Sequence, residues 1–194
     1  LAMLVLGIGA GDEVIIPANT FIATAWGVSH AGATPVFVDC NPDPWEIDIT
    51  KIEAKITAKT KAIIGVHLYG QPFDIDGVAA ICKKHNLKFI EDAAQAQGAM
   101  YKGKPAGGFG EMACFSFYPG KNLGAYGDAG AIITNDDDLA TKCRMFANHG
   151  ALQKHLHLIE GVNSRMDGIQ AAILLAKLPF IDKWNDLRLK NALR

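Results

Sequence analysis

Two oppositely charged side chains stand just beyond the ends of apolar, strand-like segments. Lys121 follows a Pro-Gly turn after the segment Ala113–Phe117, and Asp92 directly follows the segment Lys88–Glu91. Pyridoxal phosphate requires both groups, because it forms a Schiff base with a lysine and needs an acidic partner for its pyridinium nitrogen. The pair therefore predicts carbonyl–amine chemistry on a bound cofactor.

The neighbours of Lys121 distinguish it from the many lysines that are solvated surface charges. Ser116 lies five residues before it and offers a hydroxyl able to bind phosphate. Glycine lets the backbone approach a ligand closely. Four glycines surround the lysine: Gly120, Gly124, Gly127 and Gly130. A lone aspartate at a strand end is most often a turn or capping residue, so the grouping as a whole supports the cofactor site.

Composition limits the classes of partner. The chain has 194 residues, 49% of them hydrophobic, which is enough to bury a sizeable core as one domain. Its formal net charge is -1 and no block of Lys or Arg occurs. Electrostatics therefore give no reason to expect nucleic acid or an anionic membrane as partner, and a small-molecule substrate is favoured.

No metal site is expected from the cysteines and histidines. The cysteines are widely spaced and form no metal-ligand pattern: Cys40, Cys82, Cys114 and Cys143. The histidines near position 150 also lack a partner arrangement that suggests a metal: His149, His155 and His157. Free thiols fit a reducing cytoplasm. Neither a signal peptide nor a spanning helix is visible, since the apolar start 1–9 is too short to span.

Strand and helix signals alternate with short connectors. Strands are predicted at Glu13–Pro17, Pro35–Asp39, Ala62–His67, Lys88–Glu91, Ala113–Phe117 and Ala129–Thr134. Helices are predicted at 20–31, from 49 onwards, at 76–86, from 136 onwards and at 166–194 with an interruption at Pro179. This order predicts an α/β fold with a mainly parallel sheet sandwiched by helices, in one domain.

Several polar side chains sit at or just after the predicted strand ends: Asp39, His67, Asp92, Ser116 and Lys121. In open α/β sheets, ligands collect outside the carboxyl ends of the strands. We therefore expect these side chains to meet at one rim of the sheet.

Eight short motifs follow one another along the chain: 11–17, 20–24, 32–39, 60–72, 90–96, 115–124, 127–130 and 163–167. In this order they resemble the DegT/DnrJ/EryC1/StrS aminotransferases, which are fold-type-I pyridoxal-phosphate enzymes acting mainly on keto sugars attached to nucleotides. The resemblance covers essentially the whole chain. It implies the large cofactor-binding domain of such an enzyme, similar in fold to aspartate aminotransferase.

The resemblance assigns a role to each matching side chain. Lys121 would form the Schiff base and move the substrate proton, and Asp92 would keep the pyridine nitrogen protonated. Gln95 would contact the phenolic oxygen of the cofactor, Ser116 would bind its phosphate, and Phe21 would stack on its ring. Without the resemblance, Phe21 reads equally well as a core phenylalanine on a helix.

Three further residues have competing readings. In the family, the residue at Asn163 reaches across a dimer interface to the phosphate in the partner's site, whereas alone it reads as a helix cap. The guanidinium group of Arg165 could bind a substrate carboxylate or diphosphate through two parallel hydrogen bonds, or form a surface ion pair. His67 could contact substrate as a base, or be a structural histidine with its hydrogen bonds satisfied.

The implied activity is transfer of an amino group, by family habit from glutamate, to a nucleotide-linked keto sugar. Such a reaction makes amino sugars for a cell-surface polysaccharide or a secondary metabolite, in a cytoplasmic homodimer with shared active sites. Alternatives are an aminotransferase acting on a keto-cyclitol and a degenerate, non-catalytic binding or regulatory protein. The dehydratase branch of the family replaces the Schiff-base lysine with His, so Lys121 argues against it.

The resemblance also indicates what this chain lacks. Family members are longer, with a Gly-Thr turn before the position of Leu1 that grips phosphate and a small domain after Arg194. Residue 1 is Leu, and the first residues read as the middle of an element. We therefore expect residues 1–194 to be part of the large cofactor-binding domain of a longer protein.

Overall fold

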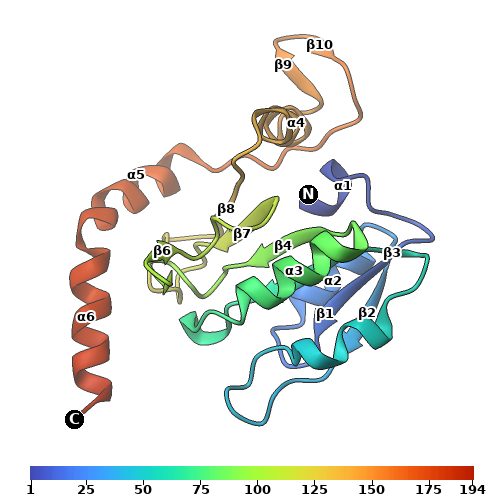
Figure 1. Cartoon of the computed structure of the whole chain (residues 1–194). Coiled ribbons are helices and arrows are strands. Elements are labelled where there is room, and N and C mark those ends of the chain that lie inside the picture. Colours follow the sequence, from blue (N-terminus) through green and yellow to red (C-terminus); the bar gives the residue numbers. More distant parts are fainter.

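The computed structural model describes all 194 residues and is built around one six-stranded sheet. Its strands are β1 (Glu13–Pro17), β2 (Thr34–Val38), β3 (Thr60–Val66), β4 (Lys88–Asp92), β7 (Met112–Ser116) and β8 (Gly130–Ile133). They lie in the order β2-β1-β3-β4-β7-β8, and all neighbours are parallel except β7 and β8, which are antiparallel. The predicted α/β fold with a mainly parallel sheet is confirmed (Figure 1).

Helices cover the sheet and extend from its β8 edge. They are α1 (Ala2–Val5), α2 (Ala23–Ser29), α3 (Ile75–His85), α4 (Asp137–Ala147), α5 (Gly168–Lys177) and α6 (Ile181–Ala192). Two small hairpins pair β5 (Met100–Tyr101) with β6 (Lys104–Pro105), and β9 (Ala151–Gln153) with β10 (Leu156–His157). No helix is both long enough and apolar enough to cross a membrane.

Both faces of the sheet are buried, and alternate side chains of a strand pack on opposite faces. Val14 and Ile16 of β1 pack with Val28 of α2 on one face, while the intervening Ile15 packs with Val78 of α3 on the other. Because successive side chains of a strand point to opposite faces, a strand covered on both sides needs an unbroken apolar run. The sequence Val14-Ile15-Ile16 supplies it, and the central strands are held from both sides.

The helix predicted from position 49 is wrong. Two short 3₁₀ turns, Ile49–Lys51 and Glu53–Lys55, occupy this segment, and Ile52 between them is buried in the core. β-Branched residues are frequent here, and they lose side-chain freedom in an α-helix. The predicted break in the last helix is present, because Leu178–Phe180 forms a 3₁₀ turn around Pro179, which lacks the N–H that a helix interior needs.

The strand order also determines where a ligand can enter. β2 lies on one side of β1 and β3 lies on the other. The order in which strands are added to the sheet therefore reverses between β1 and β3, although the strands themselves stay parallel. Segments leaving adjacent strands at such a point diverge, and the gap outside the carboxyl ends is open to a ligand. The segment after β1 and the ends of β3, β4 and β7 border this side of the sheet.

Candidate active site

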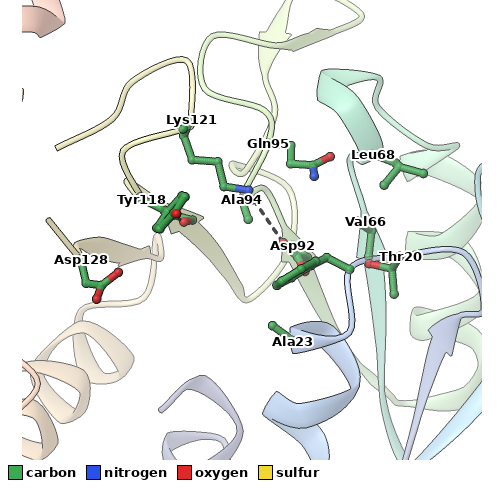
Figure 2. A pocket seen from close by; sticks show the side chains of 13 residues that line it. Thr20, Ala23, Val66, Leu68, Asp92, Ala94, Gln95, Tyr118, Lys121 and Asp128 are labelled. Carbon is green, nitrogen blue, oxygen red and sulfur yellow. Dashed lines mark hydrogen bonds between the residues drawn. The ribbon is translucent and has the colours of Figure 1, made fainter. Parts of the chain in front are cut away.

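A cavity of about 620 Å³ opens at the carboxyl ends of the central strands. Its walls carry side chains from the segment after β1, from the ends of β4 and β7, and from the turn that follows β7 (Figure 2). The lining side chains that could act on a ligand are Thr20, Phe21, Asp92, Gln95, Ser116, Tyr118, Lys121 and Asp128. Five of the side chains that the sequence predicts as site residues therefore come together in one cavity.

Asp92 is the last residue of β4 and is held in a fixed orientation. It lies in register with Val66 of β3 and with Cys114 of β7. Its Oδ1 accepts a hydrogen bond from the N–H of Ala94 at 3.1 Å, and its Oδ2 accepts one from the hydroxyl of Thr24 at 2.7 Å. Each oxygen keeps a further lone pair for a ligand.

Lys121 lies on the tight turn that follows β7. Its N–H donates to the carbonyl of Tyr118 at 2.8 Å, and its side chain extends into the cavity toward the side where Asp92 lies (Figure 2). The turn requires glycine at Gly124, because a Cβ there would lie 2.5 Å from the carbonyl oxygen of Pro119. The backbone that presents the lysine therefore depends on glycine at position 124.

Helix α5 anchors the end of this turn. The Nζ of Lys177 donates to the carbonyl of Gly124 at 2.6 Å and lies 4.4 Å from the ring centre of Tyr126. Leu123 on the turn is buried in a small apolar cluster with Leu174 of α5. The turn therefore depends on α5 for its position, although α5 itself lines no part of the 620 Å³ cavity.

An amide network ties the turn to the sheet and to α6. Asn122, beside the lysine, donates to the carbonyl of Gln97 at 2.7 Å, and Asn185 of α6 donates to the same oxygen at 3.1 Å. Gln97 in turn donates from Nε2 to the carbonyl of Ser116 at 2.5 Å. Sequence reasoning missed these residues, because no spacing rule pairs amides so far apart in the chain.

The remaining cavity residues differ in exposure. Phe21 is 66% exposed, which excludes its alternative reading as a core residue. Gln95 is held by an N–H of the Leu68–Gly70 turn, since its Oε1 accepts from Tyr69 at 2.7 Å. The Oγ of Ser116 accepts from the N–H of Tyr118 at 3.3 Å and remains accessible from the cavity wall.

His67 has a structural role, which differs from the substrate contact considered from the sequence. Its side chain is fully buried, it lines no part of the 620 Å³ cavity, and its ring stacks on Phe73 with centres 4.7 Å apart. Its Nε2 lies 2.9 Å from Oε2 of Glu91, which is also fully buried. A residue enclosed in this way cannot reach a substrate.

Glu91 holds the loop between β6 and β7 against the sheet. Its oxygens accept backbone hydrogen bonds from Gly107 and Phe109 at 2.7 Å each and from Gly110 at 2.8 Å. Burial alone would raise the pKa of Glu91, but the hydrogen bonds from His67 and these three N–H groups outweigh it and hold the pKa below its ordinary value. The carboxylate next to Asp92 in sequence is therefore a structural group.

Three predicted residues lie outside the cavity. Asn163 is exposed and bridges to Asn148, so it does not cap α5, whose N-cap is Asp167. Arg165 donates to the side-chain oxygen of Asn148 at 2.6 Å. Asp39 pairs with Lys51 at 3.3 Å at the end of β2. Asp39 and His67 do lie at the same carboxyl edge of the sheet as Asp92, because β2, β3 and β4 run parallel, but neither side chain lines the cavity.

The cavity residues fit the requirements of pyridoxal phosphate. They offer an amine, an oriented carboxylate with free lone pairs, an exposed aromatic ring and a hydroxyl, in a cavity of the size typical of small-molecule sites. No group of three or more His, Cys, Asp or Glu side chains is arranged to hold a metal ion. Burial, followed by the charge of Asp92, raises the pKa of the Cys114 thiol to about 12, so this neighbour stays neutral.

Comparison with known proteins identifies relatives over the full chain. The family model of the DegT/DnrJ/EryC1/StrS aminotransferase family matches residues 1–194. A pleiotropic regulatory protein of Geobacillus stearothermophilus is 55% identical over 99% of this chain and 52% of its own length. A UDP-N-acetyl-3-dehydro-alpha-D-glucosamine 3-aminotransferase of Acidithiobacillus ferrooxidans is 52% identical over the same shares.

A solved structure is also similar to this chain over most of its length. The crystal structure of ntda from Bacillus subtilis with bound cofactor PMP superimposes with a TM-score of 0.86 and 42% identity, covering 93% of this chain and 41% of that one. The chain spans about half the length of the curated relatives it matches.

Replacing Glu91 by Gln tests the structural role of the buried carboxylate. A glutamine amide cannot accept all the hydrogen bonds that Glu91 accepts, so we expect Glu91→Gln to lower the free energy of unfolding by about 2–4 kcal/mol. Urea unfolding at pH 7 measures it. Glu53→Gln is the matched control, because it removes a carboxylate whose ion pair with Lys84 is exposed, and we expect a much smaller loss.

The same pair of proteins tests the lowered pKa of Glu91. Because the folded-state pKa lies below the unfolded value of about 4.3, the stabilisation is complete above that value and is lost as the pH falls toward the folded pKa. The stability gap between wild type and Glu91→Gln should therefore narrow on acidification below about pH 4. If the difference in unfolding free energy between wild type and Glu91→Gln stays constant as the pH falls below about 4, the pKa of Glu91 is not lowered by folding.

Proposed function

The chain belongs to the DegT/DnrJ/EryC1/StrS aminotransferase family, and on this premise we propose that the protein is a pyridoxal-phosphate-dependent aminotransferase. We assign it a nucleotide-linked keto sugar as amino acceptor and glutamate as donor. The observation that supports this most is that Lys121 and Asp92 line one cavity with Ser116, Gln95 and Phe21. The relative from Acidithiobacillus ferrooxidans, by its name, acts on a nucleotide sugar.

Bound pyridoxal phosphate would supply an electron sink and a carrier for the amino group between the two substrates. Asp92 would accept the N–H of the ring nitrogen on a remaining lone pair, and the hydrogen bonds from Thr24 and Ala94 would keep its carboxylate aligned. Lys121 would hold the cofactor through Nζ, which must be neutral to attack. After release, the same Nζ would take a proton from the α-carbon of the amino donor in the first half of the reaction and would deliver a proton to the former carbonyl carbon of the acceptor in the second half.

The other cavity residues would orient the group. Ser116 would donate a hydrogen bond to the phosphate, Gln95 would contact the phenolic oxygen, and Phe21 would cover the ring face. An aromatic side chain exposed on the wall of a cavity is well suited to stacking on a planar ligand. The role of Arg165 toward a carboxylate or diphosphate stays a proposal, since its guanidinium now pairs with Asn148.

We further propose that two copies share their active sites, with Asn163 of each copy completing the phosphate site of the other. Asn163 lies outside the cavity of its own chain and is exposed, as a residue serving a second copy would be. The four cysteines are free, which agrees with a reducing cytoplasm as the place of reaction.

A regulatory function is the second candidate, because the relative from Geobacillus stearothermophilus is named a pleiotropic regulatory protein. A binding role alone would not require Lys121, Asp92 and Ser116 to line one cavity. Their convergence favours catalysis. A keto-cyclitol acceptor would use the same catalytic groups and differs only in the sugar-binding surface.

Amino transfer can be followed as release of 2-oxoglutarate from glutamate in the presence of UDP-, dTDP- and GDP-linked keto sugars and of keto-cyclitols. We expect turnover by wild type with at least one nucleotide sugar and a loss of at least ~10²-fold in Lys121→Ala. Lys142→Ala, which removes an exposed lysine on α4, should keep the wild-type rate. Equal rates in both variants would contradict the role of Lys121, and a cofactor-loaded enzyme inert to every acceptor would favour the regulatory function.

Shared active sites predict complementation between two inactive variants. Co-expression of Lys121→Ala with Asn163→Ala gives mixed dimers in which one site carries both defects and the other carries neither. Activity should rise above that of either variant alone, toward roughly a quarter of wild type if the two chains pair at random. Activity no higher than the average of the two separate variants would show that each chain uses its own Asn163.

A further inference from the structure

Two threonine hydroxyls form a chain that ends on Asp92. The Oγ1 of Thr24 donates to Oδ2 of Asp92 at 2.7 Å, and the Oγ1 atoms of Thr20 and Thr24 are 2.9 Å apart. Thr24 is only 6% exposed, whereas Thr20 is partly exposed and lines the cavity. Two consecutive hydrogen bonds thus connect the hydroxyl of Thr20 at the cavity wall, through Thr24, to the buried side of the Asp92 carboxylate.

The direction of these hydrogen bonds follows from the chemistry of the groups. An ionised carboxylate only accepts, so the single proton of the Thr24 hydroxyl is committed to Asp92. The contact between the two threonines must then be made by the proton of Thr20, with Thr24 as acceptor. A hydroxyl that accepts a hydrogen bond is a stronger donor in its turn, so Thr20 strengthens the bond from Thr24 to the carboxylate.

The position of Thr24 is fixed by packing. It lies in the first turn of α2, where its N–H donates to the carbonyl of Phe21 at 3.0 Å. Its neighbour Ala25 and the next-turn residue Val28 are buried against the sheet. A β-branched side chain has few rotamers in a helix, so the hydroxyl is already placed before a ligand binds.

On the basis of the proposed function, we propose that Thr24, assisted by Thr20, is a positioning residue that aligns the Asp92 carboxylate with the ring nitrogen of the cofactor. Thr24 holds Oδ2 while the N–H of Ala94 holds Oδ1, so the plane of the carboxylate is defined at both oxygens. The segment Thr20–Thr24 also carries Phe21. One turn of chain would therefore place both the ring-covering aromatic and the donor that aligns the acid.

Thr24→Val, which keeps the shape and removes the hydroxyl, tests this proposal in the cofactor-loaded protein. We expect kcat to fall roughly ten- to hundredfold, with KM for both substrates changed less than about threefold. The pH midpoint of the bound cofactor's visible absorbance should move upward by up to about one unit, because a ring nitrogen that is less well protonated withdraws less electron density. Thr24→Ser, which keeps the hydroxyl, should restore both.

Thr60→Val is the matched control, since Thr60 is equally buried but lies on β3 at the far end from the cavity. It should leave kcat and the absorbance midpoint unchanged. A wild-type midpoint in Thr24→Val, or equal defects in Thr24→Val and Thr24→Ser, would overturn the proposal. The absorbance titration needs no sugar, so a failure of the proposed substrate would leave this test intact and distinguishable.

Discussion

The register between β4 and β7 is the constraint on which the site depends. Asp92 pairs with Cys114, so Ser116, two residues further along β7, must emerge beside Asp92 at the same edge of the sheet. Parallel pairing of covered strands allows little slippage, because a shift by one residue would turn the buried side chains of a strand to the opposite face. The position of Ser116 relative to Asp92 is thereby set by the core.

The strands alone do not hold the turn that carries the lysine. After Ser116 the backbone leaves β7, and its position depends on contacts with α5 and α6, through Lys177 to Gly124 and Asn185 to Gln97. These helices follow the catalytic segment by many residues, so the site forms only when the end of the described chain has folded back. The acid is fixed by the sheet, and the amine by the helices.

Sequence patterns predicted the strands and the groups at their ends well, because a buried parallel strand requires a continuous run of apolar residues, which can be recognised in the amino-acid sequence. They failed for the helix from position 49, where turn-forming and β-branched residues prevailed. They selected Asp92, which lines the cavity, but gave no role to the neighbouring Glu91, which is fully buried. That difference follows from the alternation of β4 and from partners such as His67 that are distant in sequence.

We propose that this cavity directs one amine, that of Lys121, to a bound pyridoxal phosphate. The most direct measurement is to mix the protein with one equivalent of the cofactor, reduce with borohydride, digest, and locate the modified lysine by mass spectrometry. We expect a single modified peptide carrying the cofactor on Lys121. Modification at another lysine, such as Lys177, or spread over the surface lysines would contradict it.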